Sequence, residues 1–248
     1  MDLFQLCHGV KGVLSPLDGD KYANDKELLT TLEKLGLDSS KFFHVSGCLY
    51  SYCYNNGFVR LEMYGVDEEY FKDFNVIDSI NEREKYISNA LESNDFDSVL
   101  SIVAKPLRFD AYKALFDRIP EEDRFDTFIW IYTTSEYGFS DLDKDFLKTV
   151  FKYRKEKPKL PKSCGSEVTI YRGVCSKSTP AEDALSWTLD KGVAHYYACR
   201  FGSGKVYSGK IKKSDILWHI EHEDEVLVKP SRVKITGVEN GDKSKMKL

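Results

Sequence analysis

The sequence predicts an α+β protein whose helices and strands are largely separated along the chain. Apolar residues recur at spacings of three and four through residues 68–155, which is the pattern of amphipathic helices. After residue 162 the chain changes to short segments rich in β-branched and aromatic residues, which are typical of strands. We therefore expect a helix-rich N-terminal region over residues 1–155 and a β-rich domain over residues 163–248.

Composition and charge are those of an ordinary folded protein. Of 248 residues, 42% are hydrophobic and 31% are charged, and Tyr and Phe, at 15 each, are too frequent for a disordered chain. Residues 1–160 carry 21 basic and 29 acidic side chains, whereas residues 161–248 carry 15 and 11. This C-terminal excess of +4 suits an anionic ligand, either a dinucleotide or a nucleic acid, but is too small for a dedicated nucleic-acid binder.

No segment indicates export or a membrane partner. Residues 1–14 have neither the basic start nor the apolar stretch of a signal peptide, and no apolar run approaches the roughly 18 residues of a membrane span. We expect a cytoplasmic protein. Its six scattered cysteines are expected to be free thiols. Cys48 and Cys53, with His44 nearby, are too loosely spaced for a zinc site, and no metal is expected.

Residues 1–65 predict one helix and one β-hairpin. Asn24-Asp25 precedes four leucines between residues 28 and 35, which indicates a capped amphipathic helix. Phe42–Tyr54 is rich in β-forming residues, and Phe58–Tyr64 returns as a second strand. Asn55-Asn56-Gly57 between them accepts the positive φ that a hairpin turn requires.

Four helical stretches are expected next, interrupted by Pro106, Pro120 and the region of Gly138. They are Ile77–Ala90, Val99–Ile119, Asp123–Tyr137 and Leu142–Tyr153. Core packing explains their apolar spacing, and no catalytic constellation lies among them.

A basic run, Lys152–Lys162 (KYRKEKPKLPK), separates the two parts of the chain. It holds six basic residues, one acid and two prolines, so it cannot bury apolar area and is expected to be an extended, solvated linker. Contact with a nucleic acid through this run is an alternative interpretation.

Five strands and one helix are expected beyond the linker. The strands are Val168–Arg172, Ser186–Leu189, Lys205–Ile211, Glu225–Val228 and Val233–Val238. The helix is Lys191–Phe201, and Asp190 is placed to cap it.

Three of these segments carry residues capable of chemistry. One strand ends in Tyr171-Arg172-Gly173. A second places the hydroxyls of Ser186 and Thr188 on one face, around Trp187. A third opens with Glu223-Asp224-Glu225, and the period of two puts both glutamates on the same side. Each segment alone is explained by ordinary strand structure, but their order within one small β-rich region calls for a common explanation.

Together they resemble the R-S-E class of mono-ADP-ribosyltransferases, the arginine-specific and clostridial-toxin-like enzymes. That family is marked by an Arg on its first strand, a Ser-x-Ser/Thr on a second and a Glu-x-Glu opening a later one. The matching residues here are Arg172, Ser186-Trp187-Thr188 and Glu223-Asp224-Glu225, within residues 165–240. The resemblance implies a split β-sandwich fold, with NAD as co-substrate in the cleft between two sheets. The 14 residues from Arg172 to Ser186 are fewer than in many members.

The resemblance also implies roles for the matching residues. Glu225 is the carboxylate that stabilises the positive charge on the ribose as its bond to nicotinamide breaks. Arg172 clamps the dinucleotide phosphates, and Ser186 holds Glu225 or the ribose.

Five further residues complete the expected cofactor-binding set: Tyr171, Gly173, Trp187, Thr188 and Tyr197. Trp187 and Thr188 are expected to shape their strand, and Tyr171 or Tyr197 to stack on the nicotinamide. Core packing is the alternative for both tyrosines.

The acceptor is expected to be a protein arginine. Glu223 matches the family residue that activates the acceptor, and a guanidinium needs such help because it is protonated at any cellular pH. Ser214–His222 takes the place of the family's acceptor-recognition loop, with Trp218 and His222 as contact residues. Core packing is the alternative for Trp218 and Ile220.

Other functions remain open at this point. Transfer to a nucleic acid and plain NAD hydrolysis are alternatives within the same chemistry. An inactive module that binds a nucleotide or a partner is an alternative of another class, although intact Arg, Ser and Glu residues argue against it. An RNA 2′-phosphotransferase is a third, but no His-centred motif lies near Tyr171 or Ser186. Family habit suggests a bacterial or phage effector or toxin, of the kind that an antitoxin inhibits.

Overall fold

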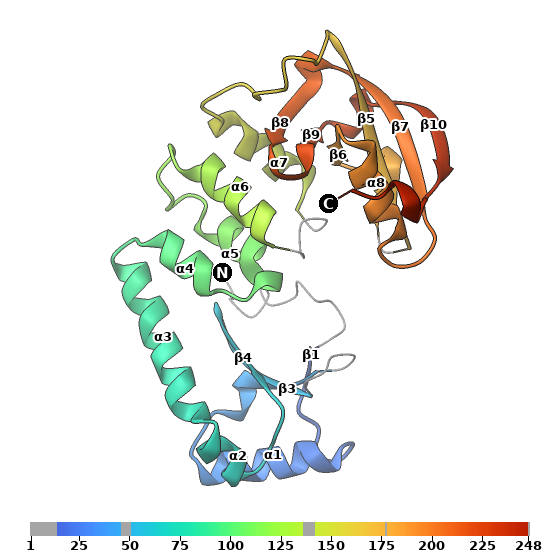
Figure 1. Ribbon diagram of the computed structural model, residues 1–248. Helices are drawn as coiled ribbons and strands as arrows, with labels where there is room; N and C mark the ends of the chain where they lie inside the picture. The colour runs from blue at the N-terminus through green and yellow to red at the C-terminus, as the bar shows by residue number, and fades with distance from the viewer. Residues whose placement is uncertain (1–13, 46–50, 136–141, 177, 248) are drawn as a thin grey trace. The chain divides into compact units, whose positions relative to one another are not determined.

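The computed structural model describes residues 14–45, 51–135, 142–176 and 178–247 (Figure 1). The chain divides into two compact units, Met1–Tyr153 and Arg154–Leu248. The division falls inside the basic run of the sequence. Both units combine helices with antiparallel strands, so the predicted α+β class is confirmed.

The first unit contains a four-stranded antiparallel sheet, in which each strand pairs with the next one along the chain. Its strands are β1 (Leu14–Pro16), β2 (Phe42–Val45), β3 (Tyr52–Asn56) and β4 (Val59–Met63). The predicted hairpin is confirmed at β3 and β4, where Gly57 takes a left-handed φ of 59°. The single strand expected over Phe42–Tyr54 is wrong, because β2 and β3 are separate strands that pair with each other.

The rest of the first unit is helical, as predicted. Its helices are α1 (Ala23–Lys34), α2 (Glu68–Asp73), α3 (Val76–Glu92), α4 (Phe96–Ile102), α5 (Arg108–Leu115), α6 (Arg124–Thr134) and α7 (Lys144–Val150). The helix expected over Val99–Ile119 is broken, because the backbone becomes extended at Val103 and Ala104. Pro106 therefore falls in the first turn of a new helical segment, where its missing N–H is tolerated. Tyr137 and Gly138 lie outside the described residues.

Helix α1 has the predicted extent, but Asp25 does not cap it. The helix starts at Ala23, and Leu28 and Leu32 on its apolar face are fully buried. Asp25 is also fully buried, and its carboxylate accepts hydrogen bonds from the Asp18 backbone N–H at 2.9 Å and the Tyr52 hydroxyl at 2.7 Å. The predicted cap is wrong because these long-range donors, rather than the first turn of the helix, take the carboxylate.

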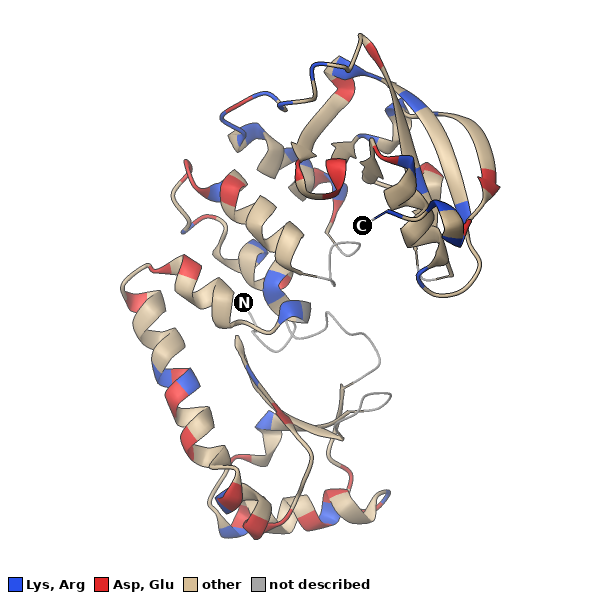
Figure 2. Ribbon diagram, in the orientation of Figure 1, with Lys and Arg blue, Asp and Glu red and all other residues tan. Residues whose placement is uncertain are grey.

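Aromatic residues fill the core beneath α5 and α6. Phe109 and Phe128 are at most 1% exposed. The Arg124 guanidinium carbon lies 4.7 Å from the ring centroids of both Phe116 and Tyr153. Core packing therefore explains the apolar spacing of α5 and α6. Charged residues are spread along the helices α1 and α3 (Figure 2).

The second unit is built on a six-stranded antiparallel sheet in the order β10-β7-β5-β6-β9-β8 (Figure 1). Its elements are β5 (Glu167–Val174), β6 (Ser186–Thr188), α8 (Lys191–Cys199), β7 (Lys205–Lys212), β8 (Ile216–Ile220), β9 (Glu225–Val228) and β10 (Lys234–Asn240). The five predicted strands and the helix are confirmed. The Gly192 N–H donates to Asp190 at 2.7 Å, which confirms the predicted cap. The loop expected over Ser214–His222 is wrong, because β8 pairs with β9 as an edge strand.

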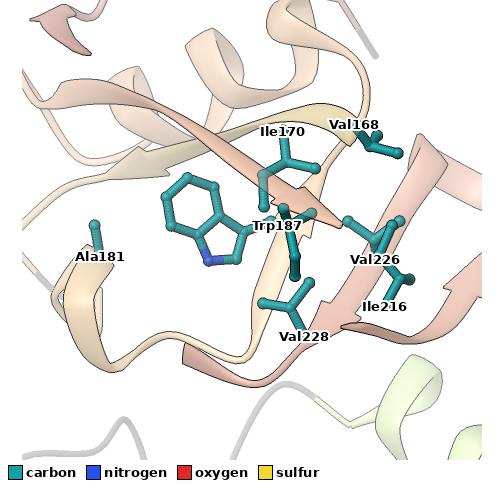
Figure 3. Packing of buried hydrophobic residues seen from close by; sticks show 8 residues of the cluster. Val168, Ile170, Ala181, Trp187, Ile216, Val226 and Val228 are labelled. Carbon is teal, nitrogen blue, oxygen red and sulfur yellow. The ribbon is translucent and has the colours of Figure 1, made fainter. Parts of the chain in front are cut away.

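This sheet consists of two three-stranded halves that meet at a narrow junction. Strands β10, β7 and β5 form one half, and β6, β9 and β8 form the other. A single residue pair, Tyr171 with Thr188, joins β5 to β6 within the described part of the chain. The core that fastens the two halves consists of Val168, Ile170, Ala181, Trp187, Ile211, Ile216, Val226 and Val228 (Figure 3). Side chains from both halves therefore share one core across the junction.

Helix α8 packs against the opposite face of β5 and β7. Ala194 and Ala198 of the helix contact Val206, with Tyr171 packed beside them. The approach is close because Gly173 has no side chain, since a Cβ there would lie 2.1 Å from the Ala194 carbonyl oxygen. The helix that follows the Ser-Trp-Thr strand is therefore fixed against the strand that carries Arg172.

The basic run is less solvated than its composition predicts. The Arg154 guanidinium donates to the Leu217 carbonyl of β8, and His219 bonds the Lys159 carbonyl through Nδ1 at 2.7 Å. Leu160 packs against the core of the second unit. The expectation of a fully solvated linker is therefore wrong for these residues, because the edge of the sheet supplies partners for their backbone and apolar groups.

Cys53, Cys164, Cys175 and Cys199 are free thiols, as expected. Cys7 and Cys48 lie outside the described residues, and so does the weak zinc spacing that involves Cys48. Among the helices that the structure describes, none combines the length and the apolar character needed to cross a bilayer.

Candidate active site

The site is built on β6, a three-residue strand whose alternation separates core from site. Trp187 points into the core and is 2% exposed, while its indole N–H donates to the Ala184 carbonyl at 3.2 Å. Ser186 and Thr188 therefore share the other face. Pairing with β9 sets Thr188 opposite Glu225 and Ser186 opposite Leu227.

The first contact of the site joins Ser186 to Glu225. The Ser186 hydroxyl donates a hydrogen bond to the Glu225 carboxylate, and both residues are half-buried. A carboxylate that accepts a hydrogen bond from a fixed hydroxyl is held in one orientation. This is the arrangement that the sequence predicts for the working carboxylate.

Thr188 holds the other glutamate by its backbone. The Thr188 hydroxyl donates to the Glu223 carbonyl at 2.8 Å and accepts from the Asp190 N–H at 3.0 Å. The two hydroxyls of the Ser-x-Thr strand thus contact the two glutamates of the Glu-x-Glu segment, one through its side chain and one through its backbone. The role expected for Thr188, shaping the strand, is too narrow, since Thr188 also positions Glu223.

The turn that carries Glu223 is strained. Glu223 and Asp224 both take left-handed backbone conformations, with φ of 75° and 47°. Such conformations are costly for residues with a side chain and persist where surrounding contacts impose them. Here the Leu189 N–H also donates to the Asp224 carbonyl at 2.9 Å, so that two hydrogen bonds from residues 188 and 189 fix the turn. Acidic residues gather at this turn between β8 and β9 (Figure 2).

Tyr197 of α8 binds the Glu223 side chain. Its hydroxyl lies 2.8 Å from each of the two carboxylate oxygens of Glu223. Burial raises the pKa of Tyr197, and the hydrogen bond to Glu223 with the charges of Glu223 and Glu225 raises it further. The phenol is therefore a hydrogen-bond donor throughout the physiological pH range. The sequence predicts stacking on nicotinamide or core packing for Tyr197, and it does not predict the contact with Glu223.

Arg172 connects β5 to the same site. Its Nη1 donates to the Ser186 carbonyl at 2.6 Å, and its Nη2 donates to the Thr179 carbonyl at 3.2 Å. Arg172, Ser186 and Glu225 therefore form one chain of contacts across β5, β6 and β9. At least two N–H groups of the guanidinium donate to backbone carbonyls of the protein. Arg172 therefore bridges the junction of the two halves, and it is also a candidate for binding phosphate.

Three other predicted cofactor residues have evident structural roles. Trp187 is a core residue, Gly173 permits the close approach of α8, and Tyr171 packs beside α8 with the Lys191 ammonium 5.9 Å from its ring centroid. Trp187 therefore affects the site only through the position of its strand, whereas Tyr171 is half-buried and flanks the site.

Trp218 lies on β8, which pairs with β9 on the side away from β6, and His222 lies in the turn between β8 and β9. Trp218 is half-buried on β8, opposite Leu227 in the strand register, and His222 is exposed in the turn that follows. His219, which the sequence analysis passed over, is more deeply placed, with a side chain 5% exposed. Its Nδ1 bonds the Lys159 carbonyl, and its Nε2 lies 3.4 Å from the Asp224 carboxylate.

Comparisons of the sequence with protein-family models, with curated proteins and with solved structures found no match. The chemistry of this site therefore rests on its own geometry.

One hollow and the possible metal ligands were compared with this site. A surface hollow of the first unit is lined by three aspartates, three hydroxyl side chains and Trp130. Its acidic lining does not suit an anionic dinucleotide. Within the described residues, no group of three or more His, Cys, Asp or Glu side chains is arranged to hold a metal ion.

The arrangement suits a reaction in which positive charge develops beside Glu225. Its carboxylate is oriented by a hydroxyl and half-buried, where an electrostatic interaction is stronger than in water. A second carboxylate, Glu223, is held two residues away by a neutral phenol. The two carboxylates therefore suit positively charged groups, one beside Glu225 and one beside Glu223.

Proposed function

We propose that the second unit is a mono-ADP-ribosyltransferase that uses NAD as donor. The observation that carries the proposal is the contact chain from Arg172 through Ser186 to Glu225. It joins three residues that are far apart in sequence and that the motif resemblance had already grouped. Core packing alone gives no reason for a hydroxyl of this strand to hold a half-buried carboxylate.

Each residue of this chain has a defined part in the proposed reaction. NAD supplies a ribose whose bond to the nicotinamide nitrogen breaks with its electron pair leaving on that nitrogen. Glu225 stabilises the positive charge that develops on the sugar, and Ser186 keeps the carboxylate in place. Arg172 fixes β6 against β5, and its guanidinium is the proposed contact of the phosphates.

The acceptor that the site suits best is a protein arginine. In the balanced reaction an acceptor nitrogen bonds to the ribose carbon, neutral nicotinamide leaves, and one proton departs from the acceptor. Glu223 attracts the guanidinium and receives that proton before passing it to water. Trp218 and His222 flank this segment and are the proposed acceptor contacts.

The architecture of the second unit is compatible with a split β-sandwich. Its two three-stranded halves share one residue pair between β5 and β6, and their core is made of side chains from both. We expect NAD to bind where the halves meet, beside Arg172 and Ser186. Tyr171 flanks this position and is the proposed stacking partner of the nicotinamide.

The first unit and the biological setting belong to the proposal only by family habit. A transferase domain joined to another folded unit suits a phage or bacterial effector or toxin that acts in a cytoplasm. The first unit would then recognise the target or an inhibitory antitoxin. Its aromatic core and buried polar contacts support a stable folded unit, as such recognition requires.

Labelled NAD tests the proposed function. The full chain and its Glu225→Gln variant are incubated with labelled NAD and cell lysate, and the products are treated separately with protease and nuclease. Label on macromolecules with the wild type alone supports transfer, and the treatment that removes it identifies protein or nucleic acid as acceptor. Free ADP-ribose alone indicates an NAD glycohydrolase. No turnover in several lysates contradicts the proposal and favours an inactive binding module.

A further inference from the structure

Glu223 is held by contacts at both of its ends. Its carbonyl accepts the Thr188 hydroxyl at 2.8 Å, and its carboxylate accepts the Tyr197 hydroxyl at 2.8 Å through either oxygen. Its left-handed φ of 75° shows that the backbone is constrained here. A glutamate in a merely solvated turn needs none of these contacts.

The partner of the Glu223 carboxylate is neutral. The causes that raise the pKa of Tyr197 are burial, the hydrogen bond to Glu223 and the charges of Glu223 and Glu225, so the phenol keeps its proton. A Lys or Arg in its place would cancel the charge of Glu223. Tyr197 instead fixes the direction of the carboxylate and leaves its charge available to a cation.

The helix that carries Tyr197 is itself rigidly placed. Asp190 caps α8 at its start, and Lys247 donates to the same carboxylate. Gly173 admits the backbone of α8 to close contact with β5. Because α8 is fixed against the strand that carries Arg172, the position of the Tyr197 hydroxyl is tied to the rest of the site.

We propose that Tyr197 is a positioning residue that holds Glu223 toward the acceptor, and so favours transfer to a cationic nitrogen over transfer to water. This inference rests on the proposed function. Water needs no carboxylate to attract it to the sugar, whereas a guanidinium has to be drawn to one place and to give up a proton there. Loss of the Tyr197 hydroxyl therefore affects transfer and spares hydrolysis.

The kinetic test compares two rates in the full chain. Release of nicotinamide from NAD is measured with water alone and with agmatine, a small alkyl guanidine. In Tyr197→Phe we expect transfer to agmatine to fall about tenfold or more, as for the loss of one hydrogen bond to a charged group, while hydrolysis stays within about twofold. Tyr196→Phe, which removes a hydroxyl from the next residue of α8, is expected to change neither rate. Equal loss of both activities in Tyr197→Phe, or loss of neither, overturns the inference.

A second test needs no NAD. Tyrosine labelled with ¹³C at the ring carbon that bears the hydroxyl reports the titration of each phenol by NMR. We expect Glu223→Gln to lower the pKa of Tyr197 more than Glu225→Gln does, because Glu223 is the hydrogen-bond partner. Equal effects of the two variants contradict the Tyr197–Glu223 contact.

The two tests separate the possible failures. A wild-type chain that leaves NAD intact contradicts the proposed function and, with it, a role of Tyr197 in transfer. A chain that cleaves NAD but shows the same transfer ratio in Tyr197→Phe contradicts only the inference about Tyr197.

Discussion

The side-chain hydroxyl of Ser186 donates a hydrogen bond to the carboxylate of Glu225, which lies 39 positions further along the chain. The contact is possible because β6 and β9 are adjacent antiparallel strands with Thr188 opposite Glu225. Two residues on, Thr188 holds the carbonyl of Glu223. One three-residue strand therefore positions both glutamates of the candidate site.

Removal of the Ser186 hydroxyl is expected to slow NAD cleavage without unfolding the chain. A hydrogen bond to a charged group contributes about 1.5–3 kcal/mol. Ser186→Ala should therefore reduce kcat/KM for NAD by roughly 10- to 100-fold, measured as nicotinamide release. Ser203→Ala, in an exposed loop, is the matched control and should retain wild-type activity. Wild-type kcat/KM in Ser186→Ala would show that the contact has no part in the reaction.

Arg172→Lys tests the bridge across the junction. Lysine keeps the charge but lacks the planar fork that donates to the Ser186 and Thr179 carbonyls together. We expect the free energy of unfolding to fall by about 1–3 kcal/mol and NAD cleavage to fall with it. Chemical denaturation of the variant, with the exposed Arg200→Lys as control, measures the first effect. Unchanged stability in Arg172→Lys would rule out a bridging role.

Gly173→Ala tests the close packing of α8 against β5. The new Cβ would lie 2.1 Å from the Ala194 carbonyl oxygen and 2.5 Å from the Ala198 nitrogen, so the helix has to move. Overpacking of this kind typically costs about 1–3 kcal/mol, and the displaced helix would also carry Tyr197 away from Glu223. Gly237→Ala on β10 meets no atom within 4 Å and should leave the melting temperature nearly unchanged. Equal melting temperatures for the two variants would contradict this packing.

The buried Asp25 carboxylate should make the free energy of unfolding of the first unit depend on pH. Burial alone would raise its pKa, but hydrogen bonds from the Asp18 N–H, His44 and Tyr52 outweigh it, so that the pKa is lowered. A depressed carboxyl pKa contributes stability that is present above the unfolded value near about 4 and is lost as pH falls through the folded value. Asp25→Asn should therefore lower the free energy of unfolding by about 2–4 kcal/mol at neutral pH, and by less near pH 3.

Urea denaturation at pH 7 and pH 3 measures this difference. The exposed Asp20→Asn serves as control and is expected to stay within about 0.5 kcal/mol of the wild type. A gap between Asp25→Asn and wild type that is the same at both pH values would contradict the lowered pKa.

Much of the fold follows from local sequence pattern. The leucines of α1, the glycine turn between β3 and β4 and the alternation around Trp187 each depend on neighbours a few residues away, so the sequence predicts them. Asp190 could be assigned as a cap for the same reason, since the helix it caps begins at the next residue.

Long-range contacts explain what the sequence could not predict. Asp25 resembles a helix cap until its donors at residues 18, 44 and 52 are known. The segment that forms β8 is expected from the sequence to be a loop because it takes the place of the family's acceptor-recognition loop, and its pairing with β9 shows that it is a strand.

Some features of the candidate site could likewise be predicted from the sequence, and others could not. Arg172, Ser186 and Glu225 could be singled out from motif spacing, because the motif lists residue types. The Tyr197–Glu223 contact depends on where α8 lies across β5, and the bridge from Arg172 to the Thr179 carbonyl depends on the path of a loop. Neither contact can be predicted from the order of residues in the chain.

The most direct test of the central claim is the release of nicotinamide from NAD by the purified full chain and by Glu225→Gln. Glutamine keeps the size of the side chain and removes the charge that is proposed to stabilise the sugar. We expect measurable release by the wild type and a loss of at least about 100-fold in the variant, with both chains equally stable. Equal release by the two chains, or none by the wild type with either agmatine or lysate as acceptor, would contradict it.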